Sequence, residues 1–277
     1  MLNWLKIDCT LEKNSYKPSF FIGSLIRGVL GHSLKSVICI NPIYKCDGCF
    51  AYSDCLYYKF YEEENVFHSF RLGITLQPNS LDFSIYLFED ATNSLPYILS
   101  AIKKAFEEIG ITKNQILMRV KSIKVSNQEV YDGKDFLSLT KITLNNLEID
   151  NFYKDVVLEF TMTLRLKEKN QLVRKIFQFQ TLINNIHNRY QQLKGETRTK
   201  LGYKVHGEIV ESTLKFVDMQ RYSNRQKSKM QYGGLKGNIK IEGIDKQSFV
   251  YLKIGEIIGA GKQTVFGLGS YIIKGER

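Results

Sequence analysis

The 277-residue sequence lacks any uninterrupted apolar run long enough to cross a bilayer. Its first residues, MLNWLKIDCTLEK, alternate apolar with charged side chains and so lack the apolar centre of a signal peptide. These two absences argue against a membrane protein and against a secreted one. We therefore expect a cytoplasmic protein with no membrane partner.

The common phosphate-binding motifs are also missing, although GAGKQTVFGLG at 259–269 has four glycines in eleven positions. A P-loop needs a glycine five residues before Gly261, and that position is Glu256. The dinucleotide fingerprint fails because Thr264 stands where its third glycine belongs. We expect no nucleotide cofactor. The loop is then either a tight hairpin or a backbone that lies close to a nucleic acid.

Acidic residues are scarce in the second half of the chain, which has a formal charge of +11 overall. Residues 1–150 hold 16 Lys and Arg against 17 Asp and Glu, whereas 151–277 hold 23 against 11. Basic side chains are interleaved with aromatic and amide ones in QRYSNRQKSKMQYGG, as on surfaces that bind single-stranded RNA. The alternative is a solvated loop face. The basic candidates for RNA binding are Arg189, Arg198, Lys200, Lys204, Arg221, Arg225, Lys227 and Lys229.

Hydrophobic periodicity predicts the same order of elements twice. In the first half, a strand, a helix, a hairpin of two strands, a helix and a strand are expected at 5–12, 18–38, 70–78, 81–90, 94–110 and 115–125. In the second half, the same order is expected at 155–167, 177–195, 202–217, 235–243, 247–258 and 266–273. The prediction is an α+β protein of tandem ferredoxin-like (βαββαβ) domains.

We place the domain boundary near residue 150. The first domain, 1–150, contains a cysteine-rich insertion at 39–60, and the second, 151–277, contains the glycine-rich loop at 259–269.

Four of the five cysteines fall within CINPIYKCDGCFAYSDC. Cys39, Cys46, Cys49 and Cys55 leave gaps of six, two and five residues, and the two-residue gap is typical of zinc sites. A metal would fold an insertion that has little apolar material of its own. Structural zinc is the expectation, and an iron–sulfur cluster uses the same ligands. Cys9 lies on the apolar face of the first strand and is expected in the core.

The glycine loop has a pattern of its own, Gly-h-Gly, five residues, Gly-h-Gly, formed by Gly259, Ala260, Gly261, Gly267, Leu268 and Gly269. Together with two ferredoxin-like units and a basic second half, it resembles the RAMP superfamily of CRISPR-associated proteins. More narrowly, the chain is similar to the endoribonuclease of that superfamily that cuts the repeats in precursor CRISPR RNA. The IRGVLGHSLK helix followed by the cysteines and CLYYKFYE resembles one branch of this family.

The resemblance implies where the chemistry lies. Metal-independent RNA cleavage needs a base, an acid and a cation, and the catalytic histidine of the resembled family commonly sits on or just after the first helix. His32 is therefore the expected catalytic residue, with Lys35 as a charge stabiliser and Arg27 as a phosphate contact. The alternative is that His32 is a helix-edge residue packed under the cysteine loop.

The other three histidines compete less well. His187 and His206 belong to the basic domain, where each could bind RNA or play a purely structural part. His68 follows the insertion and could complete a metal site.

The resemblance further implies an endoribonuclease that cuts by attack of the RNA 2′-hydroxyl, without a catalytic metal, in antiviral defence. The products would be a 2′,3′-cyclic phosphate and a 5′-hydroxyl. The loop would pack against RNA and the first domain, adding Gly259, Gly261, Lys262, Gly267 and Gly269 to the RNA-binding set. Two alternatives stay open: a non-catalytic RAMP subunit that binds guide RNA, and an unrelated basic protein that binds structured RNA. Further partners would be other CRISPR effector subunits or a second copy of the chain.

Overall fold

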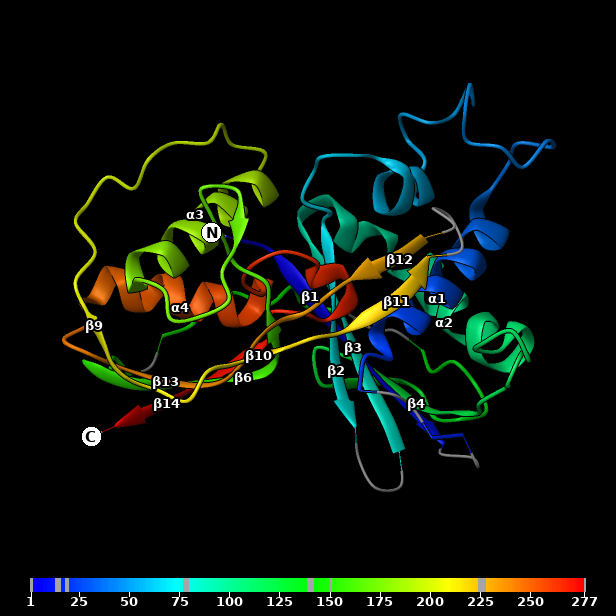
Figure 1. Cartoon of the computed structure of the whole chain (residues 1–277). Helices are drawn as coiled ribbons and strands as arrows, with labels where there is room; N and C mark the ends of the chain where they lie inside the picture. The colour runs from blue at the N-terminus through cyan, green and yellow to red at the C-terminus, as the bar shows by residue number, and fades with distance from the viewer. Residues whose placement is uncertain are drawn as a thin grey trace. The chain divides into compact units, whose positions relative to one another are not determined.

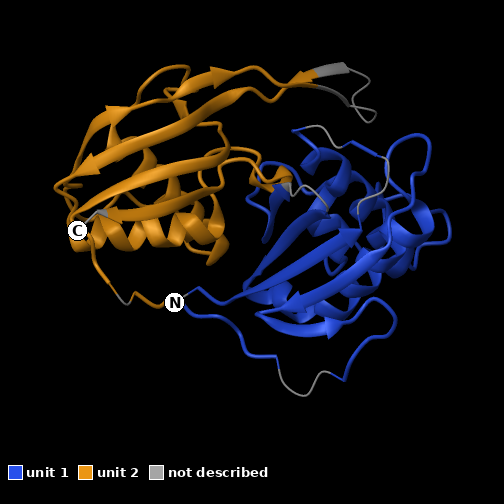
Figure 2. Ribbon diagram, turned by 90° about the horizontal axis from the view of Figure 1, so that it is seen from below, with its two compact units in different colours: residues 1–146 blue, residues 147–277 orange. Residues whose placement is uncertain are grey.

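The computed structural model describes residues 2–12, 16–17, 20–76, 80–138, 142–149, 151–223 and 228–276. The chain divides into two compact units, residues 1–146 and 147–277, coloured separately in Figure 2. The sequence placed the boundary near residue 150. Each unit contains one antiparallel sheet of five strands together with helices, so the predicted α+β class is confirmed (Figure 1).

The sheet of the first unit has the strand order β2-β3-β1-β4-β5. Its strands are β1 (Trp4–Glu12), β2 (Phe70–Leu76), β3 (Ser80–Phe88), β4 (Val120–Val125) and β5 (Gln128–Tyr131). Its helical segments are α1 (Gly23–Ile38), the π-helical turn η1 (Tyr58–Glu62), the 3₁₀ segment η2 (Glu89–Ser94), α2 (Leu95–Lys104) and the π-helical turn η3 (Ala105–Ile109).

Strand β1 lies in the middle of the sheet, and every second side chain of this strand is apolar. Leu5, Ile7, Cys9 and Leu11 are buried, whereas the side chains between them reach the other face. The register pairs Ile7 with Ile85 of β3 and with Val125 of β4. The predicted core position of Cys9 is confirmed.

Helix α1 covers this sheet together with α2, against which it packs. It buries the apolar stripe Ile26, Val29, Leu30 and Leu34, and the hydroxyl of Ser33 donates to the carbonyl of Ala101 on α2 at 2.8 Å. The predicted helix start at Pro18 and Ser19 lies outside the described residues.

The helix predicted at 94–110 forms as α2 followed by η3, and it ends at Gly110, whose φ is +79°. The strand predicted at 115–125 begins only at Val120, and β5 was not predicted.

The sheet of the second unit has the order β10-β13-β6-β14, with β9 also paired to β13. Its strands are β6 (Asp155–Leu164), β9 (Glu208–Ser212), β10 (Lys215–Val217), β13 (Gly234–Glu242) and β14 (Tyr271–Glu276). Two separate hairpins are formed by β7 (Lys167–Glu168) with β8 (Gln171–Leu172) and by β11 (Gln220–Ser223) with β12 (Ser228–Gln231). The helical segments are α3 (Phe179–Leu193), α4 (Lys246–Ile258) and the 3₁₀ turn η4 (Thr264–Phe266).

Helices α3 and α4 lie side by side on one face of this sheet (Figure 1). The face is apolar because β6 buries Val156, Leu158, Phe160 and Met162 in alternation. The strand predicted at 202–217 is divided into β9 and β10. No helix within the described ranges is long and apolar enough to span a bilayer.

Candidate functional site

His32 lies on the exposed side of α1, between the buried residues Gly31 and Ser33. The helix presents it to solvent because the apolar stripe on the opposite side packs into the core of the unit. Its imidazole is therefore available to a ligand in solution, which the alternative of a histidine packed under the cysteine loop did not predict.

An aromatic clamp holds α1 just before His32. The π-helical turn η1 follows the cysteine insertion and places the ring of Tyr61 against Gly31, where a Cβ would lie 2.5 Å from Tyr61 Cε1. The guanidinium of Arg27 lies 4.5 Å from the centre of the Tyr61 ring and donates to the Phe60 carbonyl at 3.3 Å. Arg27, which we predicted to contact phosphate, thus bridges α1 and η1 in this structure.

Lys35 lies three residues after His32 and faces the insertion. Its ammonium stands 4.9 Å from the ring centre of Tyr57 and 5.3 Å from that of Tyr44. Burial raises the pKa of the Cys46 thiol, and the positive charge of Lys35 partly opposes this rise. The predicted charge stabiliser is therefore a cation that lies beside two aromatic rings of the insertion.

Two tyrosines next to α1 are unsuited to act as bases. Burial raises the pKa of Tyr57, and the hydroxyl donates to Glu62 at 2.9 Å, which raises it further. Burial also raises the pKa of Tyr61 to about 12, although the nearby charge of Arg27 lowers it. These raised pKa values disfavour the phenolate of both tyrosines, which leaves the exposed imidazole of His32 as the candidate general base on α1.

The four cysteines of the insertion are free and half-buried. Cys39, Cys49 and Cys55 line one hollow of about 460 Å³, while Cys46 and Cys49 line a second. Among the described residues, no group of three or more His, Cys, Asp and Glu side chains is already gathered as a metal site.

Three other histidines have partners of their own. His187 is buried, with Nδ1 at 2.8 Å from the Tyr251 hydroxyl and Nε2 at 3.1 Å from the Thr199 carbonyl. His68 Nδ1 lies 2.9 Å from the Lys59 carbonyl. His206 is exposed, and its backbone N–H donates to Asp245 at 3.0 Å.

The glycine loop is an internally bonded turn between α4 and β14. Its four glycines all have positive φ, between +70° and +84°. Their N–H groups donate within the unit, to Gly255, Asn185, Thr264 and Thr163 for Gly259, Gly261, Gly267 and Gly269 respectively. These backbone donors are therefore already used, and of the predicted loop contacts only Lys262 extends an exposed side chain.

Lys262 belongs to a basic cluster. Burial lowers its pKa, and the positive charges of Lys167 and Arg198 lower it further. Arg198 was predicted as an RNA contact, and Lys167 was not. Three cations this close repel one another, and a bound phosphate would relieve that repulsion.

The other basic candidates divide into three groups. Lys200 and Lys204 are exposed on the segment that leads to β9. Arg189 is buried, with 2% exposure, and its Nε donates to the Ile258 carbonyl at 2.8 Å. Its predicted RNA contact is therefore corrected to a bond that joins α3 to the end of α4. Arg225 and Lys227 lie outside the described residues, and for Arg221 and Lys229 only the backbone is described.

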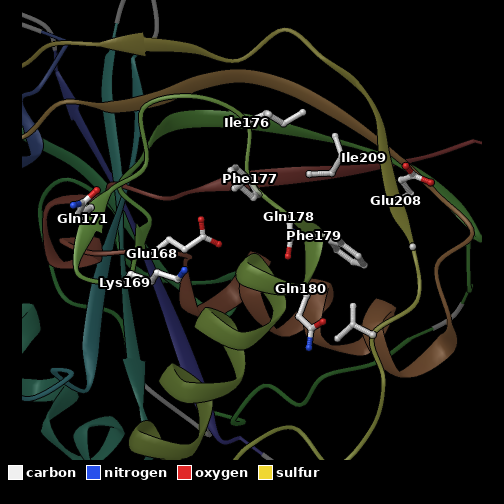
Figure 3. Close-up of a pocket in the computed structure, with 12 residues that line it drawn as sticks. Glu168, Lys169, Gln171, Ile176, Phe177, Gln178, Phe179, Gln180, Glu208 and Ile209 are labelled. Atoms are coloured by element: carbon white, nitrogen blue, oxygen red, sulfur yellow. The ribbon is translucent and has the colours of Figure 1, made fainter.

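A further hollow lies in the second unit, and no predicted site residue lines it (Figure 3). It has a volume of about 860 Å³, and the β7–β8 hairpin, the start of α3 and β9 surround it. Amide side chains of Gln171, Gln178 and Gln180 share it with the rings of Phe177 and Phe179. The charged side chains of Glu168, Lys169 and Glu208 also line it, and its lining contains no histidine.

The chain is similar to known proteins over both of its units. A family model described as an N-terminal domain matches residues 2–145, and the model described as CRISPR-associated endoribonuclease Cas6 matches residues 158–271. An uncharacterized protein of Archaeoglobus fulgidus is 24% identical over 285 residues, which cover 95% of this chain and 96% of that protein.

The chain is also similar in fold to solved Cas6 structures. Thermus thermophilus Cas6 is 11% identical, with a TM-score of 0.58 over 99% of each chain. A Cas6 product complex is 13% identical, with a TM-score of 0.59 over 99% of this chain and 100% of that chain. A chain of a partial Cas6-RT-Cas1–Cas2 complex is matched with a TM-score of 0.56 and 13% identity over 99% of this chain and 46% of its own.

This is the class of two-unit α+β protein to which the solved Cas6 structures belong. Residues 158–271 match the model of CRISPR-associated endoribonuclease Cas6, and this match confirms the resemblance to that family seen in the sequence.

Proposed function

We propose that this protein binds CRISPR repeat RNA and cuts precursor CRISPR RNA by attack of a 2′-hydroxyl, with His32 as the catalytic residue. The proposal rests on one observation above all, the exposed imidazole of His32 on α1 in a chain of an endoribonuclease family. One of the solved Cas6 chains of similar fold is a histidine-to-alanine mutant, so a histidine of that protein was chosen for substitution.

The chemistry needs one proton acceptor and one proton donor. Neutral His32 takes the proton of the 2′-hydroxyl, and the 2′-oxygen forms a bond to the adjacent phosphorus. The bond from phosphorus to the 5′-oxygen then breaks; that oxygen takes a proton from solvent, to which the protonated His32 returns the one it accepted. The products are a 2′,3′-cyclic phosphate and a 5′-hydroxyl, with no water consumed and no metal required. Lys35 is the proposed cation for the charge on the phosphoryl oxygens.

The second unit is proposed to hold the RNA through its basic side chains. Lys262, Lys167 and Arg198 already form a cluster of positive charge, and Lys200 and Lys204 are exposed. The strand orders of both sheets support a ferredoxin-like module in each unit, a fold whose sheets and loops often bind RNA. Other CRISPR subunits or a second copy of the chain are the further partners we propose, since one solved relative is a Cas6-RT-Cas1–Cas2 complex.

The deciding experiment compares three proteins on repeat RNA from the same genome, in excess EDTA. Wild type is expected to make one discrete cut and leave a cyclic phosphate. His32→Ala should lose about 10²- to 10⁴-fold in rate while binding the RNA with unchanged affinity. His206→Ala is the matched control, because His206 is also exposed but lies in the other unit; its rate should be unchanged.

Two results would overturn parts of the proposal. Tight, repeat-selective binding without a cut by wild type would favour the non-catalytic subunit. A cut that survives His32→Ala would retain the endoribonuclease and remove His32 from the mechanism. Circular dichroism of each sample in EDTA separates a lost reaction from a lost fold.

A further inference from the structure

The cysteine insertion, residues 39–60, is held together by something other than an apolar core. Its large apolar side chains point outward: Ile40, Ile43 and Phe50 are 70%, 72% and 75% exposed. Side chains this exposed contribute little hydrophobic stabilisation. Phe60, at the end of the segment, is the buried exception, and it packs on Phe70 of β2.

The cysteines show the opposite pattern. All four are half-buried, whereas the large apolar side chains beside them are exposed. Three of the four also share one hollow, which Cys39, Cys49 and Cys55 line. Cys46 and Cys49 line a second hollow, so Cys49 belongs to both hollows.

The backbone between Cys46 and Cys49 is shaped as a chelating turn. The N–H of Cys49 donates to the Cys46 carbonyl at 3.2 Å, and Gly48 supplies the positive φ of +66° that the turn requires. A two-residue gap closed in this way brings two sulfur atoms to the same side of the chain. Two more turns follow, with the N–H of Tyr52 bonded to Cys49 and that of Cys55 bonded to Tyr52.

A positive charge is present where a thiolate site would need one. Zinc bound by four thiolates carries a net charge of about −2, which a low-dielectric surrounding would disfavour. The Lys35 ammonium lies beside the insertion, 4.9 Å from the ring centre of Tyr57 and 5.3 Å from that of Tyr44. It therefore balances part of that charge from outside the ligand set.

From these contacts we propose that Cys39, Cys46, Cys49 and Cys55 together bind one zinc ion that folds the insertion. The four thiols are not gathered among the described residues, so the proposal requires that zinc binding draw them together. The free energy of binding then becomes stability of the insertion. This proposal stands apart from the proposed RNA cleavage, because the metal serves structure only.

The test measures metal, not activity. Full-length protein, purified under reducing conditions, is expected to contain one zinc per chain, and X-ray absorption should find four sulfur atoms at about 2.3 Å from it. Exchange of zinc for cobalt should produce the intense visible bands of tetrahedral cobalt–thiolate coordination. Cys46→Ser and Cys49→Ser should each weaken cobalt binding at least tenfold, whereas Cys9→Ala, in the core of the first unit, should leave the spectrum unchanged.

Several outcomes would overturn the proposal. They are a protein without metal, a metal with oxygen or nitrogen neighbours in the absorption data, an iron–sulfur chromophore, or two disulfides in the insertion. Unchanged cobalt spectra in Cys46→Ser and Cys49→Ser would do so as well. The absorption measurement on wild type decides the matter even where a variant fails to fold.

Discussion

The imidazole of His187 accepts a hydrogen bond from the hydroxyl of Tyr251. The assignment follows from the other ring nitrogen: Nε2 lies 3.1 Å from the Thr199 carbonyl, which can only accept, so Nε2 carries the proton and Nδ1, at 2.8 Å from the hydroxyl, is the acceptor. His187 thereby connects α3, α4 and the segment after α3. A histidine with both nitrogens engaged in this way is a structural residue.

We therefore expect His187→Ala to lower the free energy of unfolding by about 2 kcal/mol, because it leaves a hydroxyl and a carbonyl without their partner. Tyr251→Phe removes one of the two bonds and should cost about 1 kcal/mol. Urea titration checks both. Cleavage by the folded His187→Ala protein should equal that of wild type, and a large loss of rate without a loss of stability would contradict this assignment.

A second test compares Gly269 of the glycine loop with Gly195 outside it, because both have a φ of +70° but differ in their surroundings. A Cβ on Gly269 would overlap the Ala260 carbonyl, whereas a Cβ on Gly195, after α3, would meet nothing within 4 Å. Gly195→Ala should cost about 1 kcal/mol from the backbone conformation alone. Gly269→Ala should cost about 3 kcal/mol or more, since the loop must also move. Equal thermal midpoints for the two variants would refute the close approach.

Much of this fold could be predicted because its long elements repeat one period over many residues. β1 and β6 alternate over their whole length, and the helices carry apolar stripes that continue for three turns or more. The hairpins β7–β8 and β11–β12 were missed because two to four residues cannot display a period. The first of these hairpins turns at Lys169 and Asn170, which both have positive φ. The asparagine was a signal in the sequence for this turn.

Of the candidate site, the sequence indicated a helix-edge position for His32, and only the structure shows that the side chain is exposed. The burial of Arg189 was missed, although its spacing of three from Ile186 and four from Leu193 puts it on the buried stripe of α3. The clamp of Tyr61 on Gly31 has no such signal, because two segments separated by the insertion meet only in the folded unit. Patterns of one element were readable, and contacts between elements were not.

That clamp yields a third prediction from two helical glycines of α1. A Cβ on Gly28 meets nothing within 4 Å, so Gly28→Ala should stabilise the protein by about 0.5–1 kcal/mol through helix propensity. The same change at Gly31 meets the Tyr61 ring at 2.5 Å and should destabilise by about 1–2 kcal/mol despite the same propensity gain. Urea midpoints check the opposite signs. Stabilisation by Gly31→Ala would mean that Tyr61 does not pack there.

Asp245, at the start of α4, is expected to contribute to the free energy of unfolding in a way that depends on pH. Asp245 accepts from the Ser248 N–H at 2.8 Å and the Ser248 hydroxyl at 2.7 Å; burial would raise the pKa of the carboxyl, but these bonds outweigh it and the pKa is lowered. A lowered pKa gives stability that is complete above the unfolded value, about 3.9, and is lost as pH falls through the folded one.

Asp245→Asn keeps an acceptor but no charge, so the stability gap to wild type should be constant near neutrality and shrink below about pH 4. Urea titrations across that range measure it. Asp245→Ala, which removes the cap, should cost about 1 kcal/mol at neutral pH. A gap that grows on acidification would contradict the direction of the shift.

The basic cluster on the second unit predicts how RNA binding responds to salt. The neighbouring charges of Lys167 and Arg198 disfavour the ammonium of Lys262, which a phosphate would stabilise. If Lys262 contacts one phosphate, Lys262→Gln should weaken binding and reduce the slope of log K against log salt by about 0.7. Lys253→Gln is the matched control, since Lys253 is paired with Glu256 on α4; its slope should equal that of wild type. Equal slopes for all three proteins would mean that Lys262 does not contact the RNA. Its exposed side chain would then have no role in RNA recognition.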